Sequence, residues 1–370
     1  MTDMKHSTYE GHLSKKNAVT AFKSKSPSSH KTRQTSKERV TKAINFGYPD
    51  RPPISHAILP AVQIKYGEAL NEILQKVHED FGWDLMVDME RSELPPLYKG
   101  GKNYDAFGTL WEVAEEGVCG IPIEYPLADW SKYSEYKWPE LTAGPSQKRL
   151  YSGHVAGKSP DYYARGAWIT FFEQMQQLRG MENLLMDLAF ESKEVYQLRD
   201  DLLEFNLKWI DKWLRFPYDG LHFADDWGMQ SGLIISPKTW RKVFKPVYRA
   251  MFDKVIKAGL DVHYHSDGNI LEILPDLIEL GVKVINCQLT VTGIEEVMKK
   301  FAGKVCFRTD LDRQQIMPFG TPEQVREHIK TIFNSIGTKK GGIIACGEIG
   351  PDIPLENICA MYEVFMNYRY

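Results

Sequence analysis

The sequence lacks the features that mark several classes of protein. Its 370 residues contain no apolar run approaching the roughly 18 residues that a membrane-spanning helix requires. The net charge of −3 leaves no excess of positive charge with which to bind nucleic acid. The N-terminal stretch has no continuous apolar segment of the kind found in secretory signals. We therefore expect neither a nucleic acid nor a membrane as a partner, but a small-molecule substrate.

Cysteine is scarce and irregularly placed. The five cysteines form no CxxC pair and are an odd number: Cys119, Cys287, Cys306, Cys346 and Cys359. This pattern argues against a disulfide framework and favours a reducing compartment, so we expect a cytoplasmic protein.

Residues 1–35 differ in composition from the rest of the chain. They are rich in Lys, Ser and His and poor in large apolar residues. Such a segment cannot bury enough apolar surface to fold, so we expect a solvated tail, with a transit peptide as the alternative. Residues 36–370 are expected to form the folded domain, because 43% hydrophobic residues overall allow a large core.

From residue 220 onward, apolar strands alternate regularly with helices. Five strands are predicted at 220–228, 260–265, 282–288, 304–310 and 341–350, and earlier ones at 83–89 and 168–175. Helices are predicted at 63–82, 182–214, 237–259, 269–280, 293–301, 321–337 and from about 354. Nearly continuous apolar strands are typical of a parallel sheet buried on both faces. We predict an α/β fold, a single (β/α)8 TIM barrel with a polar N-terminal tail. A doubly wound open sheet is the alternative, weakened by the lack of a GxGxxG turn. The aromatic and Pro-rich residues 90–150 predict a structured insertion or a lid.

The stretch 260–270, LDVHYHSDGNI, carries the densest set of reactive groups. His263, His265 and Asp267 occupy alternate positions and therefore point to one side of an extended strand. Asp267 also suits the N-cap of a helix starting at 269, His265 could simply bond a neighbour, and His263 could be a packed core residue.

Polar side chains also end the other predicted strands, as expected for a barrel active site. Asp226 is expected to face the barrel mouth, with Asp225 as the alternative. Arg308 is expected to pair with Asp310, Asp312 or a substrate carboxylate. Imidazole, thiolate and carboxylate are the usual zinc ligands. We predict a zinc site made by His265, Asp267 and one of Cys346 or Glu348. His263 lies one step deeper on the same strand and is expected to support the site or to be a further ligand. The catalytic candidates are Asp226, Arg308 and His263.

Several long motifs resemble the uroporphyrinogen decarboxylase superfamily. They include SKERVTKAINFGYPDRPPI, FADDWGMQSGLIISPKTW, HSDGNILEILPDLIELGVKVINCQ and GEIGPDIPLENICAMYE, and the resemblance covers about residues 36–370. The resemblance implies a barrel fold. Within the superfamily, the chain resembles the corrinoid-linked methyltransferase branch more than the true decarboxylases. There a His-x-Cys pair and a later Cys hold zinc. Here His265 matches the His, Asp267 stands where the Cys would be, and Cys346 matches the later Cys only with one inserted residue.

The resemblance implies a corrinoid-linked methyltransferase or demethylase acting on a small methylated substrate, with the corrinoid on a separate protein. The alternative is a decarboxylase of a porphyrin-like or other carboxylated compound, in which Asp226 stabilises a protonated intermediate and Arg308 holds a carboxylate. Against it, residues 54–74 contain no Arg, where true decarboxylases of this superfamily carry several. A third possibility is a ligand-binding barrel without catalysis. A homodimer is left open.

Overall fold

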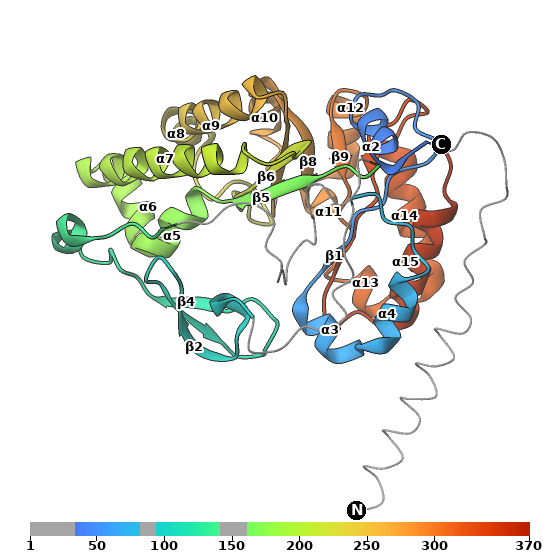
Figure 1. The fold of residues 1–370 in the computed structure, drawn as a ribbon, viewed down its shortest axis with the longest axis horizontal. Helices are drawn as coiled ribbons and strands as arrows, with labels where there is room; N and C mark the ends of the chain where they lie inside the picture. Colours follow the sequence, from blue (N-terminus) through green and yellow to red (C-terminus); the bar gives the residue numbers. More distant parts are fainter. Residues whose placement is uncertain (1–33, 82–93, 141–160) are drawn as a thin grey trace, which may run out of the picture.

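The protein is a (β/α)8 barrel, seen in a computed structural model that describes residues 34–81, 94–140 and 161–370 (Figure 1). Six parallel strands form one sheet in the order β10-β9-β8-β7-β6-β5. Their bounds are β5 (Arg165–Ile169), β6 (Gly220–Ala224), β7 (Asp261–Ser266), β8 (Val282–Cys287), β9 (Cys306–Arg308) and β10 (Ile343–Ile344). Each of these strands lies next to the strand that precedes it in the sequence. In a doubly wound sheet, the direction in which successive strands are added reverses partway through the sheet. The predicted barrel is thus the observed fold.

The sheet continues past β10 toward the start of the chain. β11 (Glu348–Ile349) pairs in parallel with β1 (Ala57–Ile58), and Ile54 bridges Ala345. The backbone N–H of Asp80 donates to the carbonyl of Ile54, and the carbonyl of Asp80 accepts from Tyr163, just before β5. The chain around Asp80 therefore connects the first strand to β5. The strand predicted at 83–89 lies outside the described residues.

Helices pack around the sheet (Figure 1), and many of their apolar residues are buried. Their bounds are α2 (Ser36–Ile44), α3 (Pro60–Tyr66), α4 (Glu68–Leu74), α5 (Phe172–Arg179), α6 (Met181–Phe190), α7 (Lys193–Trp213), α8 (Pro237–Val243), α9 (Lys245–Lys257), α10 (Leu274–Glu279), α11 (Leu289–Thr292), α12 (Ile294–Phe301), α13 (Ile316–Phe319), α14 (Pro322–Ile336) and α15 (Leu355–Asn367). In α14, Thr321 and Gln324 form a capping box, and Val325, Ile329 and Ile336 are buried on one face. None of the described helices combines the length and apolarity needed to cross a bilayer.

Several predicted elements are shorter or begin elsewhere. The helix predicted at 63–82 is two short helices separated by Gly67, whose φ of 47° breaks the helix. The strand predicted at 168–175 is wrong, because β5 ends at Ile169 and α5 begins at Phe172. The helix predicted from 269 begins at Leu274, followed by Pro275, which is tolerated only in the first turn.

A small antiparallel sheet interrupts the barrel between β1 and β5. It contains β2 (Gly101–Tyr104), β3 (Leu110–Val113) and β4 (Ile121–Glu124), flanked by short 3₁₀ turns η2 (Pro96–Tyr98) and η3 (Trp130–Glu135). Gly117 accepts a backbone hydrogen bond from Ala61 at the start of α3, and Leu178 in α5 accepts one from Leu127. The described part of the predicted insertion is therefore structured. It is attached to two elements that follow barrel strands, at the end where active sites of this fold lie.

Helix α2 opens the described domain and is held by a buried ion-pair network. Asp80 is fully buried and pairs with Arg39 at 2.6 Å and Arg51 at 2.8 Å. This network attaches the first helix to the barrel. The predicted tail, residues 1–35, lies almost wholly outside the described residues, so its solvation stays a prediction.

Candidate metal centre and its surroundings

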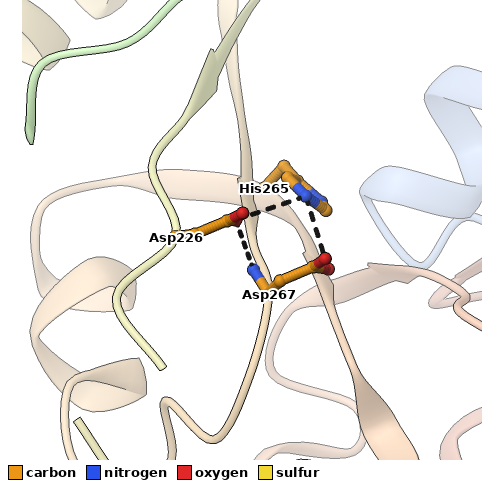
Figure 2. Close-up of side chains that lie close together, drawn as sticks. All are labelled: Asp226, His265 and Asp267. Atoms are coloured by element: carbon orange, nitrogen blue, oxygen red, sulfur yellow. Dashed lines mark hydrogen bonds and ion pairs between the residues drawn. The ribbon is translucent and has the colours of Figure 1, made fainter. Parts of the chain in front are cut away.

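Three side chains meet where β6 and β7 end. Asp226 follows β6, His265 is in β7, and Asp267 comes directly after it. Ala224 pairs with His265 in the parallel register, so the two strands end at the same level. One potential ligand atom from each side chain lies within 4.8 Å of the others (Figure 2). We call Asp226, His265 and Asp267 the His265 group.

The hydrogen bonds of Asn286 determine which nitrogen of His265 faces this group. The Nδ2 of Asn286 donates to the carbonyls of Arg308 at 2.9 Å and Thr309 at 3.4 Å. Its Oδ1 must therefore be the acceptor for Nδ1 of His265 at 2.8 Å. A neutral His265 then carries its proton on Nδ1 and directs the lone pair of Nε2 toward Asp226 and Asp267. This is the tautomer of a metal ligand oriented by a neighbouring oxygen.

The two carboxylates are held by separate contacts. Asp226 accepts a hydrogen bond from the backbone N–H of Asp267 at 2.7 Å. The Oδ1 of Asp267 accepts from Arg313 at 2.7 Å. Arg313 also contacts Glu348 at 2.5 Å and Asp310 at 3.5 Å. Burial lowers the pKa of Arg313, but the three carboxylates together outweigh burial and raise it. Arg313 is thus a fixed cation within an acidic rim.

The backbone around the His265 group is closely packed. A Cβ on Gly228 would lie 2.4 Å from the amide nitrogen of Asn269, and Gly268 has a φ of 74°. Only glycine at both positions lets the loops after β6 and β7 approach this closely. The two loops are also joined by the N–H of Gly228, which donates to the carbonyl of Asp267. This contact sets the spacing between Asp226 and Asp267.

Adjacent Asp225 and Glu173 have different roles from Asp226. Asp225 is buried and accepts from the N–H groups of Phe171 and Glu173 and the hydroxyl of Tyr248. Asp225 therefore orders the start of α5, and burial raises its pKa to about 7. Glu173 accepts from the N–H of Asp226 at 2.9 Å. Burial, followed by the charge of Asp226, raises the pKa of Glu173 well above its usual range, which makes Glu173 a candidate proton donor beside the group.

The spacing of the His265 group fits a tetrahedral metal ion. The Nε2 of His265 lies 3.6 Å from Asp226 and 3.5 Å from Asp267. Zinc bonds of about 2.0–2.2 Å to nitrogen and oxygen place neighbouring ligands of a tetrahedron about 3.3–3.6 Å apart. One imidazole nitrogen and two carboxylates therefore suit a divalent ion such as zinc, with one coordination position left for a substrate.

The other predicted site residues are placed differently. Among the described residues, the group of potential ligands contains Asp226 in addition to His265 and Asp267, but neither Cys346 nor Glu348. Cys346 is buried, and its backbone bonds both ways with Thr309. Burial raises the pKa of its thiol, which disfavours a thiolate. Glu348 instead pairs with Arg313.

His263 and Arg308 lie deeper than the His265 group. The Nε2 of His263 bonds the hydroxyl of Tyr163 at 3.0 Å. Arg308 is 6% exposed and donates to Asn286 at 2.9 Å. Within the described part of the chain, no ion pair joins Arg308 to Asp310 or Asp312. The predicted ion pair between Arg308 and these residues is therefore wrong. Arg313, not Arg308, pairs with Asp310.

The sequence reasoning missed Glu173, Asn286 and Arg313. Glu173 was assigned to a strand, although a polar residue directly after β5 follows the same rule that found Asp226. Arg313 lies past the end of β9, and Asn286 is one residue before the end of β8. Neither position follows a strand end directly, so the sequence pattern did not single out either residue. The predicted cap role of Asp267 is also wrong, because α10 begins at Leu274 and Asp267 bonds Arg313.

Comparisons with known proteins agree on the fold. The family described as "Uroporphyrinogen decarboxylase (URO-D)" matches residues 164–368. The chain is 22% identical over 194 residues to a uroporphyrinogen decarboxylase from Pseudoalteromonas translucida, covering 49% of this chain and 52% of that protein. The chain thus spans about half the length of this curated relative. A methyltransferase from Methanosarcina mazei has a similar structure, with a TM-score of 0.60, 14% identity, and coverage of 90% of this chain and 98% of that one. At that identity the likeness shows the fold alone.

Proposed function

The chain belongs to the uroporphyrinogen decarboxylase family, and from that premise we propose that it is a metal-dependent methyltransferase of small methylated compounds. The observation that carries the proposal is the His265 group. Its imidazole lone pair and two carboxylates converge at distances that suit a metal ion. A decarboxylase of this family needs no such convergence.

In this proposal Asp226, His265 and Asp267 hold zinc, and the ion supplies Lewis acidity toward the heteroatom of the substrate. Asn286 keeps His265 in the ligand tautomer, and Arg313 limits the repulsion among the acidic side chains around Asp267. Two carboxylates in place of thiolates make the site harder, which favours an oxygen-bound methyl group over a thiol.

The methyl acceptor in this proposal is a corrinoid carried by a separate protein. The bond between the methyl carbon and the substrate heteroatom breaks, and its electron pair stays on the heteroatom. A reduced corrinoid would supply the electron pair for the new bond to the methyl group. Glu173 holds a proton that the departing heteroatom takes up.

The decarboxylase alternative has less support. Residues 54–74, which include β1, α3 and α4, contain no Arg that could hold several acidic side arms of a porphyrin-like substrate. The insertion contacts α3 at its start, through Ala61 and Gly117. A ligand bound at this end would therefore lie between these elements without the expected cations from α3 or α4.

Metal analysis of the full chain, purified without chelator, tests the proposal. We expect near-stoichiometric zinc in the wild type and its loss in His265→Ala and Asp267→Asn. Asp276→Asn is the matched control, because Asp276 pairs with Arg241 and Lys245 away from the site. Methyl transfer to a corrinoid protein should be lost together with the metal. Full methyl-transfer activity in metal-free protein would contradict the role of the metal, and wild-type protein with neither zinc nor methyl transfer would favour decarboxylation. A homodimer stays a prediction.

A further inference from the structure

Three basic side chains from three strands gather below the His265 group. Arg165 begins β5, His222 is in the middle of β6, and Arg308 ends β9. His222 pairs with His263 in the register, two residues before His265 on the same face of β7. Arg308 is linked to His265 through Asn286. The exposed fractions are 6%, 2% and 6%, respectively. We call these three residues the cationic cluster.

The cationic cluster has unsatisfied polar atoms. Within the described residues, both ring nitrogens of His222, Nη1 of Arg165 and Nε of Arg308 have no hydrogen-bond partner. A buried guanidinium without a counter-ion costs several kcal/mol, on the order of a buried unpaired charge. Native proteins rarely leave such groups unsatisfied unless a ligand or water completes them.

Arg308 acts electrostatically on Arg165, and both arginines act on His222. Burial, followed by the charge of Arg308, lowers the pKa of Arg165 to about 9. The same two arginines, after burial, lower the pKa of His222. Glu79 acts on Arg165 in the opposite direction, but more weakly than Arg308. Arg165 therefore remains charged at neutral pH, and the interior of the barrel is positive at this level.

Trp168 lies close to one member of each group, His222 and His265. Its ring centroid is 4.6 Å from that of His222 and 6.1 Å from that of His265. Trp168 is nevertheless 55% exposed, although it belongs to β5. An indole that packs against one histidine and is still accessible offers an apolar surface to a flat ligand.

We propose that the cationic cluster binds the carboxylate of the methylated substrate, and that Trp168 packs against the planar ring that carries it. The substrate class is therefore a methylated aromatic carboxylate. This inference rests on the proposed function, since it names the substrate for the same barrel. Arginine favours carboxylates because its N–H groups can donate two parallel hydrogen bonds.

The charge distribution also orients such a substrate. Asp226, Asp267, Asp310 and Glu348 make the rim acidic, with Arg313 as their shared cation. A carboxylate is repelled from that rim and attracted to Arg165 and Arg308 below it. The opposite end of the substrate, with its methyl group, then lies at the level of His265.

Equilibrium binding of benzoate to the full chain tests the proposal, with metal removed by chelator so that the His265 group does not contribute. We expect saturable binding of benzoate, and binding of benzamide, its neutral counterpart, weaker by at least about tenfold. Acetate should bind at least about tenfold more weakly than benzoate, because it has no ring. Phosphate binding better than benzoate would overturn the assignment of a carboxylate.

Variants separate a ligand site from a structural one. Arg165→Met and Arg308→Met should each weaken benzoate by at least about tenfold. Arg165→Met should melt no lower than the wild type, because it removes an unpaired buried charge. Arg326→Met, which changes an ion pair with Glu363 between α14 and α15, is the control and should leave benzoate binding unchanged.

Two results would overturn the proposal. One is equal binding of benzoate and benzamide, which would mean that the cationic cluster does not recognise a carboxylate. The other is an Arg165→Met protein that melts much lower yet, when folded, binds benzoate as the wild type does. Because benzoate binding is measured without metal, a wild-type protein that binds benzoate but takes up no zinc would refute the proposed function alone.

Discussion

Replacing Asn286 by Leu tests the orientation of His265 without touching a proposed ligand. Asn286 is 7% exposed, and its side chain has the same number and branching of heavy atoms as Leu, so the change mainly removes hydrogen bonds. The Nδ1 of His265 and Nη1 of Arg308 lose their acceptor, and the carbonyls of Arg308 and Thr309 lose a donor. We expect the imidazole of His265 to lose its fixed tautomer.

The magnitude follows from what supporting residues contribute to metal sites. Removing the group that orients a ligating histidine weakens metal binding by about 10–100-fold, or about 1.4–2.7 kcal/mol. The protein should also lose about 1–3 kcal/mol of stability for the unsatisfied buried groups. Asn357→Leu is the matched control, because Asn357 is buried and donates to the carbonyls of Met317 and Gly320 in α13 and just after it.

Zinc affinity is measured by competition with a chromophoric chelator, and the His265 tautomer by nitrogen NMR of metal-free protein. In the wild type, the proton should reside on Nδ1. Asn357→Leu should be destabilised by a similar amount, with unchanged zinc affinity. If Asn286→Leu binds zinc as tightly as the wild type, or if the wild-type proton is on Nε2, the reasoning about His265 is wrong.

Three further predictions use the same contacts. Asp226→Asn should lower turnover by at least about tenfold with little change in melting temperature, since its side chain is 44% exposed; equal turnover would exclude a role. Gly228→Ala should cost about 1–3 kcal/mol in chemical denaturation and abolish zinc binding, because its Cβ would meet Asn269; unchanged metal content would contradict this. Burial lowers the pKa of His56 to about 3 from 6.5. Below about pH 6.5, His56 is therefore protonated in the unfolded chain but not in the folded one. The free energy of unfolding should fall as the pH drops, by at most about 1.4 kcal/mol per pH unit. His56→Gln should flatten this acid limb in denaturation curves, and an identical limb would refute it.

The alternation of apolar strands and helices was enough to predict the barrel. The strands around 261–266, 282–287 and 306–308 were predicted almost at their observed positions, because a strand buried on both faces needs a continuous apolar run. Boundaries failed where local backbone geometry decides them. Gly67 divides one predicted helix, and Pro275 delays another, so periodicity alone placed their ends wrongly.

Part of the site was also visible in the sequence. His265 and Asp267 share a side because alternate residues of a strand must do so, and Asp226 follows a strand end. These are consequences of the chain's local geometry. They required no knowledge of which strands are neighbours.

The composition of the site was decided by the tertiary structure. Parallel register places Ala224 beside His265, so Asp226 joins the group, while Arg313 draws Glu348 toward itself and Thr309 holds the backbone of Cys346. Asn286 fixes His265 only because β8 lies next to β7. The sequence alone determined which residues of one strand point to the same side, since side-chain direction is a local property of the strand. Which residues meet across strands depends on register and on competing partners, and these exist only once the barrel has formed.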